Sequence, residues 1–488
     1  MNFLSKPSFA RWLVWFELLL FVLGLCLRLE HAITFDGPLR GSDYAAHLSG
    51  VRWMDAHWRP FYFAPGVHYQ VGFYPPLWYA LGALTLDFTG SEKALASFAI
   101  AGFLMRHYAL GKLLRLLAPG APVSRLCALA IHAVLPLSVL IDGKVNPEGL
   151  HAGFFTLAAY FLFRIEREAN TPAGLSLRTA SAFGLFAGLA LLTKATGALL
   201  LVAAVALFAV RSALSFWSAG FTSTFRRLVR PALLAGVVWC AAGGWWCAPN
   251  LMKYGKPFPH IWDLENPSAE TAAIHPLYRR PLGWALPFEW KEYWEFPILR
   301  TPSEPLPNFW AAEITGTWSD FYNRGFCRLH GGTVTDRVWG GLRGFMSMGT
   351  KEWSVNSRCV AGFATLLHVG VWLTLASVIA VFHAGWLALR SRFRQGSLVL
   401  PLLAILSTLS GMTFALVYPY DNIAVLNSRY LLPAVTPMCG CLGLLLARLE
   451  GTWQKGGRRG ALSLFGLTAA GGTIAAIGAL LLYIRFAP

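Results

Sequence analysis

Long apolar runs separated by short charged stretches fill most of the chain. The first of them, RWLVWFELLLFVLGLCLRL (11–29), is typical of the rest. A helix of about 20 apolar residues crosses the hydrocarbon core of a bilayer, so the pattern predicts an all-α polytopic membrane protein. We expect about eleven membrane-spanning helices, which cover 12–28, 96–115, 122–141, 149–164, 179–193, 195–211, 231–248, 360–386, 397–418, 430–447 and 461–484.

Two further patterns lie between the first two of these spans. GSDYAAHLSGVRWMDAHW (41–58) has the period of a helix that lies on the membrane surface, and Ser42 can cap its N-terminus. PPLWYALGALTLDF (75–88) is apolar but short for a span, so we expect a helix that lies in the outer interface or re-enters from it. The apolar stripe of the first helix consists of Tyr44, Leu48, Val51 and Trp58.

The polar stretches divide the chain into three parts. Residues 1–250 form an N-terminal membrane module with an acidic first outer loop over 29–95. Residues 251–359 form a larger outer segment of mixed or irregular structure. Residues 360–488 carry the C-terminal membrane helices.

The composition excludes an ordinary soluble protein. Of the 488 residues, 56% are hydrophobic and 13% are charged, which leaves too few polar side chains to cover a soluble surface. The net charge of +17 fits the excess of basic residues in cytoplasmic loops of membrane proteins. No motif for binding nucleic acid is present.

The basic residues also select an orientation. With a cytoplasmic N-terminus, the inner loops are rich in Lys and Arg and poor in acids, as the positive-inside rule requires. No cleavage site follows the first apolar run, so we expect an uncleaved first span. These features favour a multi-pass protein of a bacterial inner membrane, with the endoplasmic reticulum as an alternative. The inner basic residues include Lys112, Arg115, Arg125, Arg164, Arg167, Arg226, Arg227, Arg230 and Arg390.

The stretch FDGPLRGSDYAAHL places two acids and a histidine beside the first span. Asp43 and His47 are four residues apart, so they project from one face of the predicted helix. An Asp beside an apolar interface can act as a base toward a hydroxyl group. The simpler interpretation is an Asp in a first helical turn and a solvated histidine, since the helix dipole favours an acid there.

Several passages along the chain occur in the order found in the glycosyltransferase C superfamily. The chain resembles these polytopic membrane enzymes over most of 10–260 and 400–450. It is most similar to the branch that holds lipid A, protein O-mannosyl and lipopolysaccharide-core transferases. The matching passages are the acidic first loop, YPPLWY with Tyr74, IDGKVNPEG with Asp142 and Glu148, LLTKATG with Lys194, GGWWCAPNLMKYGKPF, and SRYLLPAV with Arg429.

The resemblance implies sugar transfer at the outer face. The donor would be a polyprenyl-phosphate sugar, and the acceptor a glycan, a lipid or a protein. Asp43 would stand where the family's first-loop acid activates the acceptor hydroxyl, and a single base predicts inversion. Many members carry two adjacent acids there. Here Asp43 stands alone, with Asp36 seven residues earlier, so Asp36 is an alternative base.

The resemblance also implies cationic contacts to the donor. Lys194 and Arg429 would contact its phosphate, on which negative charge builds as the sugar leaves, and Arg40 is a third option. Asp142 or Glu148 would be the second-loop acid. Lys194 could instead be a snorkelling lysine, and Arg429 could be an anchor at the membrane edge.

No cofactor is predicted, although some members of the superfamily use a divalent cation. The acids at 36, 43, 142 and 148 could supply hard oxygen ligands, but their spacing is not a metal signature. The histidines of the first loop lack an HExxH motif or a Cys/His pairing.

The outer segment is rich in aromatic residues and contains FWAAEITGTWSDFYNRGF. Asp320 and Trp318 are candidates for contacts to the acceptor, and a structural role is an equal alternative. Cys327 and Cys359 could form a disulfide if this segment is extracytoplasmic. Arg106 lies deep in the second span, where a charge is expensive and often functional, unless the boundary of this span is misplaced.

The main alternative function is a transporter or flippase for a lipid-linked or anionic substrate. Transporters usually show internal repeats and polar residues at mid-membrane. Here no repeat is evident and the polar residues gather on one side. A polysaccharide polymerase or ligase and a non-catalytic scaffold are further alternatives. The sequence leaves the transferred sugar open.

Overall fold

The computed structural model describes a set of helices and no β-strand within the described residues. Six helices are long and apolar enough to cross a membrane, and up to eight spans result if each of two bent helix pairs counts as one. The fold is therefore that of an all-α, multi-pass membrane protein, as predicted. The described residues are 7–34, 44–59, 67, 74–171, 173–259, 309–318, 357–391, 397–417 and 428–455.

The predicted number of about eleven spans is not confirmed. The run 122–141 is broken into α5 and α6, because the residue before Pro136 leaves the helical conformation. The run 231–248 bends by 60° at Gly243, between Ala242 and Gly244. α8 is a shorter apolar helix, α7 ends in a charged turn, and 461–484 lies outside the described residues. These helices are α5 (Pro122–Val134), α6 (Pro136–Asp142), α7 (Glu148–Glu168) and α8 (Leu177–Thr193).

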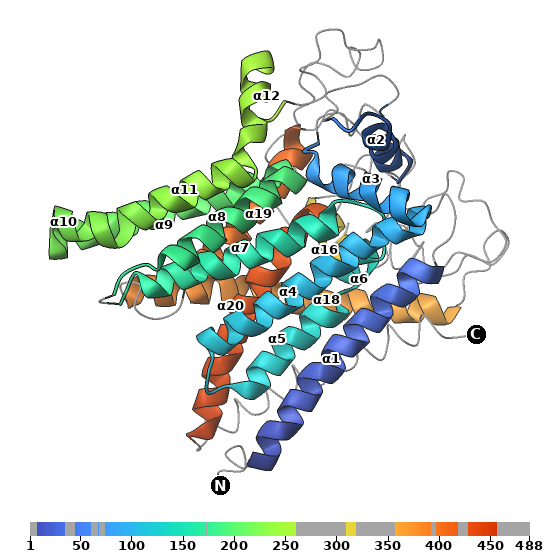
Figure 1. Cartoon of the computed structure of the whole chain (residues 1–488). Helices are drawn as coiled ribbons and strands as arrows, with labels where there is room; N and C mark the ends of the chain where they lie inside the picture. The colour runs from blue at the N-terminus through green and yellow to red at the C-terminus, as the bar shows by residue number, and fades with distance from the viewer. Residues whose placement is uncertain are drawn as a thin grey trace.

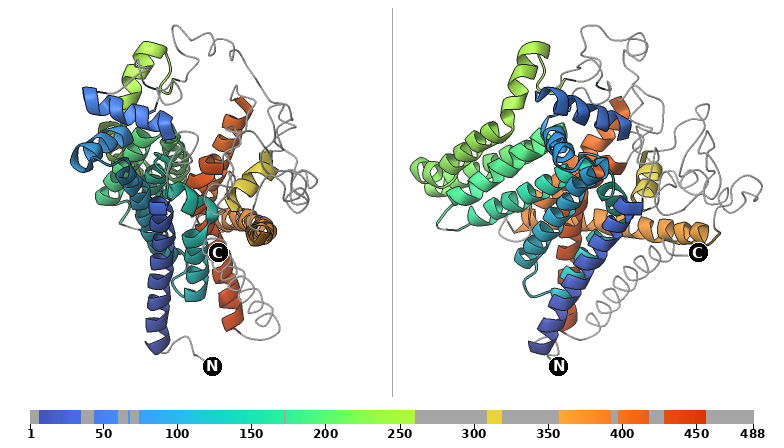
Figure 2. Two further views of the ribbon diagram at one scale, coloured as in Figure 1. Left: turned by 90° about the vertical axis from the view of Figure 1, so that its right-hand side faces the viewer. Right: turned by 45° about the vertical axis from the view of Figure 1, so that its right-hand side comes forward.

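The helices pack in two neighbouring groups. In the first, α1, α4, α5 and α20 lie side by side (Figure 1), and α18 crosses them at a steep angle (Figure 2). In the second, α7 packs against α8 and α8 against α11. The remaining helices of both groups are α1 (Pro7–Thr34), α4 (Ala96–Leu117), α9 (Ala198–Ala219), α11 (Arg230–Ala242), α18 (Ser357–Arg390), α19 (Val399–Val417) and α20 (Leu432–Gln454).

The two groups meet where α4 packs against α7. The helices approach so closely that a Cβ atom on Gly102 would lie 1.9 Å from the carbonyl oxygen of Gly149. Only residues without a side chain allow two helix backbones to come this near, as in small-residue contacts between membrane helices. This contact fixes the first turn of α7, and Glu148 is the residue that begins it.

Three short helices lie at the end of the molecule opposite to the N-terminus: α2, α3 and α12 (Figure 1). Both helices predicted in the first outer loop are present, and they pack against each other. Their interface is apolar, with Val51, Trp78 and Tyr79 completely buried. The bounds are α2 (Tyr44–His57), α3 (Leu77–Thr89) and α12 (Cys247–Tyr254).

Two predictions for the first outer loop are wrong in detail. Trp58 does not belong to the apolar stripe, because α2 ends at His57 and Trp58 is 52% exposed. His47 is not solvated, because the packing of α2 on α3 leaves it 1% exposed. Ser42, the predicted cap, lies outside the described residues.

Candidate functional site

Three charged side chains meet at the first residue of α7. Lys194 Nζ lies 3.0 Å from Glu148 Oε1, and Arg429 Nε lies 3.6 Å from the same oxygen. Lys194 comes from the bend between α8 and the 3₁₀ turn η3 (Ala195–Gly197), and Arg429 from the 3₁₀ turn η8 (Ser428–Leu431). The fold thus gathers three residues that sequence motifs far apart along the chain had singled out. We refer to Glu148, Lys194 and Arg429 as the charge cluster.

Local sequence explains how each of these residues is presented. Pro147 precedes the first turn of α7, and the side chain of Asn146 accepts a hydrogen bond from the backbone N–H of Glu148. Lys194 leaves the helical conformation and ends α8, while its N–H still bonds to the carbonyl of Ala190. The chain then turns tightly, since a Cβ atom on Gly197 would lie 2.4 Å from the backbone nitrogen of Leu191.

Two aromatic rings, those of Tyr74 and Tyr430, lie beside the charge cluster. Lys194 Nζ lies 4.7 Å from the ring centre of Tyr430 and 6.0 Å from that of Tyr74, within the range of cation–π attraction. Arg429 donates a hydrogen bond of 3.2 Å to the Tyr430 hydroxyl. His47 packs edge-on against Tyr74, with ring centres 5.5 Å apart, and its Nδ1 lies 2.9 Å from the Tyr79 hydroxyl.

The electrostatics of the cluster favour an anionic ligand. Burial alone would raise the pKa of Glu148, but attraction to Lys194 and Arg429 outweighs it and lowers this pKa well below its usual range. Glu148 is therefore a carboxylate, and the two cations leave one positive charge in excess. The pKa of Tyr74 is raised well above its usual value, mainly by burial and then by the nearby Tyr430 and Glu148. The Tyr74 hydroxyl is therefore neutral and can donate a hydrogen bond.

Asp142 does not join the charge cluster. It lies in the helix bundle with no exposed surface, where Arg28 Nε donates to its Oδ2 over 2.7 Å and Arg106 forms a second ion pair with it. Ser138 on the same helix also donates to Oδ2. Of the two acids proposed for the second outer loop, the structure brings Glu148 to the site. It also accounts for Arg106 as a partner of Asp142.

Other predicted site residues lie outside the described part of the chain: Asp36, Arg40, Asp43 and Asp320, together with Cys327 and the side chain of Cys359. Trp318 is 5% exposed and donates its indole N–H to Thr374 on α18. This contact supports the structural alternative for Trp318.

Sequence reasoning missed Tyr430, Tyr79 and Arg28. Tyr430 directly follows Arg429 in SRYLLPAV, and Tyr79 lies in YPPLWY, so both were inside quoted motifs. Arg28 stands at the end of a long apolar run, a position typical of an arginine whose charged group reaches out to water. The pairing of Arg28 with Asp142 spans 114 residues, and no local pattern could reveal it.

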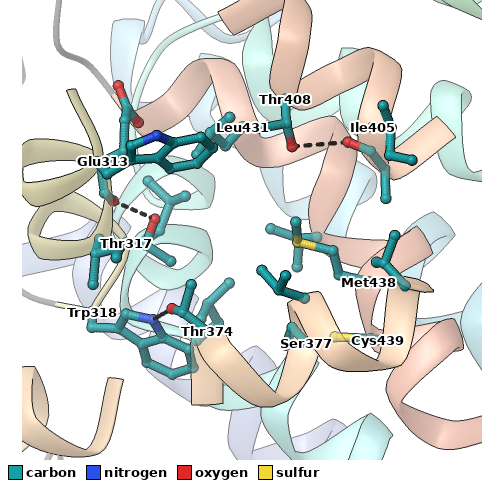
Figure 3. A pocket seen from close by; sticks show the side chains of 18 of the residues that line it. Glu313, Thr317, Trp318, Thr374, Ser377, Ile405, Thr408, Leu431, Met438 and Cys439 are labelled. Atoms are coloured by element: carbon teal, nitrogen blue, oxygen red, sulfur yellow. Dashed lines mark hydrogen bonds between the residues drawn. The ribbon is translucent and has the colours of Figure 1, made fainter. Parts of the chain in front are cut away.

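An apolar cavity of about 230 Å³ lies beside η8, between α16 (Phe309–Trp318), α18, α19 and α20 (Figure 3). Its wall includes Leu431, two residues from Arg429. The hydroxyls of Thr317 and Thr408 bond to carbonyls of their own helices, so they add little polarity. Glu313 is the acid among the lining residues; it is 3% exposed, and burial raises its pKa to about 8.

The two described acids of the second outer loop do not fit a metal site. Asp142 faces Arg28 and Arg106, and Glu148 faces Lys194 and Arg429, and such pairs of cations repel a metal ion. Within the described residues, no group of three or more His, Cys, Asp or Glu side chains could hold a metal ion.

Solved structures of similar fold include an archaeal oligosaccharyltransferase and a bacterial ArnT. The oligosaccharyltransferase of Archaeoglobus fulgidus, in complex with Zn and sulfate, is 14% identical with a TM-score of 0.50, over 95% of this chain and 53% of that one. ArnT from Cupriavidus metallidurans in the apo state is 13% identical with a TM-score of 0.49, over 98% of this chain and 76% of that one. The same ArnT bound to undecaprenyl phosphate is 13% identical with a TM-score of 0.43, over 97% of this chain and 75% of that one.

This similarity concerns the fold. The chain shares the fold of the archaeal oligosaccharyltransferase. It spans about half the length of the archaeal oligosaccharyltransferase. Comparisons with protein-family models and with curated proteins give no match.

Proposed function

We propose that the protein is a membrane glycosyltransferase. It moves a sugar from a polyprenyl-phosphate donor to an acceptor on the extracytoplasmic face, with inversion at the anomeric carbon. The observation that carries this proposal is the charge cluster, in which Lys194 and Arg429 converge on Glu148 beside a wall of aromatic rings. The glycosyltransferase C fold and the ordered motifs support it.

The charge cluster would bind the phosphate of the donor. A polyprenyl-phosphate sugar carries one negative charge on its phosphodiester, and the released polyprenyl phosphate carries up to two. Cations that contact the phosphate stabilise the transition state more than the ground state, because charge grows there as the glycosidic bond breaks. The single excess positive charge of the cluster suits this change.

The apolar cavity beside η8 would hold the first isoprenoid units of the donor. Arg429 and Leu431 belong to the same short turn, one in the charge cluster and the other in the wall of the cavity. A lipid with its phosphate at Arg429 could therefore place its chain in this cavity. Val378, Phe382, Ile405 and Leu409 line it and are exposed on the outer surfaces of α18 and α19, which suits access from the bilayer.

Glu148 would orient groups rather than take up the proton. A carboxylate whose pKa is lowered by two cations is a poor base at neutral pH. Its Oε2 has no hydrogen-bond partner among the described residues and could accept one from a sugar hydroxyl. In this proposal the base is Asp43, which directly precedes α2 in the chain, with Asp36 as the alternative. No step requires a metal.

The test is transfer of radiolabelled sugar from polyprenyl-phosphate donors by the purified protein and by single variants. Asp43→Asn should abolish transfer without lowering thermal stability in detergent. Lys194→Met and Arg429→Met should each reduce kcat/KM for the donor by about a hundredfold, since each removes a charged contact worth about 3 kcal/mol. Lys253→Met, which changes an exposed lysine of α12, is the matched control and should keep full activity.

Two outcomes would contradict parts of the proposal. Equal activity of Asp43→Asn and the unchanged protein would exclude Asp43 as the base and direct the test to Asp36→Asn. A flippase would be favoured if the protein moves a lipid-linked substrate across the membrane of proteoliposomes but transfers no sugar to glycan, lipid or peptide acceptors.

A further inference from the structure

A second set of charges lies deeper in the bundle, apart from the charge cluster. Asp142 accepts from Arg28 on α1 and from Arg106 on α4, and all three side chains are completely buried. Arg28 also donates to the carbonyls of Gly24 and Ala133 and stacks over the Phe103 ring at 3.6 Å. We refer to Arg28, Arg106 and Asp142 as the arginine clamp.

The clamp holds the start of the chain segment that ends at Glu148. Every residue from 142 to 148 is buried. Near its start, a Cβ atom on Gly143 would lie 2.2 Å from the ring of His31, so the backbone touches α1. Asn146 donates from its side chain to the carbonyl of Ile141 and accepts from the N–H of Glu148. Asn146 thus ties the residue before the clamp to the first residue of α7.

The clamp also touches α7 directly. A Cβ atom on Gly149 would lie 3.1 Å from Asp142 Oδ1, the carboxylate oxygen that does not face the arginines. Asp142 is thereby packed against the residue next to Glu148. Any shift of this carboxylate therefore moves the turn of α7 that presents Glu148 to Lys194 and Arg429.

We propose that the arginine clamp is a positioning device for the donor-phosphate site, and that Asp142 does not itself touch substrate. The clamp fixes the position of Glu148, and Glu148 in turn orients Lys194 and Arg429 beside the rings of Tyr74 and Tyr430. The inference rests on the proposed function for the meaning of the site. Breaking the clamp leaves two buried guanidinium groups facing each other, and their repulsion displaces the 142–149 segment.

The first test is Asp142→Asn, which keeps the shape of the side chain and removes its charge. The donor KM should rise by a factor of about 2 to 30, the range of coupling through packed side chains. The acceptor KM should stay unchanged, because the clamp acts on the phosphate site alone. Arg106→Lys keeps a cation at the clamp and should show a smaller rise in donor KM.

A second readout is independent of the reaction. Lys194 is buried against Glu148, so an amine-reactive reagent should modify it slowly, as quantified by mass spectrometry. Asp142→Asn should accelerate the modification. Glu166→Gln is the matched control: it removes a buried carboxylate at the other end of α7, where Glu166 accepts from Ser397 and the Leu398 N–H. It should lower thermal stability without changing Lys194 reactivity or donor KM.

If Asp142→Asn does not fold, the double variant Asp142→Asn/Arg106→Gln restores the net charge of the clamp without restoring its geometry, and the same two readouts apply. Unchanged Lys194 reactivity and donor KM in a folded clamp variant would overturn the inference. So would a rise in acceptor KM alone, because it would place Asp142 in contact with the acceptor. If the unchanged protein neither transfers sugar nor binds undecaprenyl phosphate, the proposed function fails, while Lys194 reactivity still decides whether the clamp positions the cluster.

Discussion

At the scale of single residues, the site depends on charges that burial makes strongly interacting. Glu148 is 2% exposed, and its two cationic partners have side chains that are 10% and 12% exposed. In such buried surroundings Coulomb interactions are far stronger than at a solvent-exposed surface. A carboxylate between two cations fixes their positions, yet it also competes with any anionic ligand for them.

Glu148→Gln separates these two effects, because glutamine keeps the shape and an acceptor oxygen but loses the charge. The unliganded protein should be destabilised by about 3 kcal/mol, since two buried cations lose their counter-charge. Undecaprenyl phosphate should bind more tightly, so it should raise the Tm of Glu148→Gln by more than that of the unchanged protein. Thermal unfolding in detergent with and without this ligand measures both effects. A complete loss of ligand stabilisation would contradict the role of Glu148 as a competing counter-ion.

For single residues, the sequence identified candidate site residues better than it predicted their burial and their ion-pair partners. Lys194, Arg429 and Glu148 could be named because each sits in a short motif next to an apolar run. The burial of His47 could not be predicted, because it depends on how α2 packs against α3. Asp142 and Glu148 looked equivalent from the sequence. Their separation follows from Arg28 and Arg106, which come from two other helices.

At the scale of elements, the pattern of apolar residues located the helices but not their interruptions. Two predicted spans are broken, one before Pro136 and one at Gly243. Whether such residues bend a helix or end it depends on what packs against them. α16 was also not predicted as a helix, since its sequence lies within a segment rich in Pro, Gly and Trp.

The burial of Glu313 on α16 predicts that the free energy of unfolding depends on pH. Glu313 has a pKa of about 8 in the folded protein and 4.5 as the free group. Between pH 4.5 and pH 8 the carboxyl group is ionised in the unfolded chain but protonated in the folded protein. The free energy of unfolding is therefore highest below about pH 4.5 and falls as the pH rises to about 8. Glu313→Gln cannot ionise and should remove this slope, with a gain of about 4 kcal/mol at pH 8 and about 1 kcal/mol at pH 5.

Thermal unfolding in detergent from pH 5 to pH 8 measures this slope. Thr317→Val is the control, because it alters the same helix and the same cavity wall without changing a titrating group. It should shift Tm equally at all pH values. An unchanged pH slope in Glu313→Gln would show that Glu313 is ionised in the folded protein.

At the scale of the whole molecule, charge is distributed unequally between the two ends. The charge cluster lies at one end of α7 and α8, at Glu148 and Lys194. The turn that joins the other ends of these helices contacts a second basic segment, where the N–H of Leu175 bonds to the carbonyl of Arg227. By the positive-inside rule we expect this basic end in the cytoplasm and the charge cluster on the outside.

Two cysteine variants test this orientation in a chain whose eight native cysteines are replaced by alanine. Lys253→Cys lies on α12, at the end that carries α2 and α3 (Figure 1), and Arg178→Cys lies in the first turn of α8, at the basic end. Both side chains are exposed. A membrane-impermeant maleimide should label Lys253→Cys in intact spheroplasts, and should label Arg178→Cys only after permeabilisation. The reverse result would place the site in the cytoplasm, where a transferase that serves extracytoplasmic acceptors could not work.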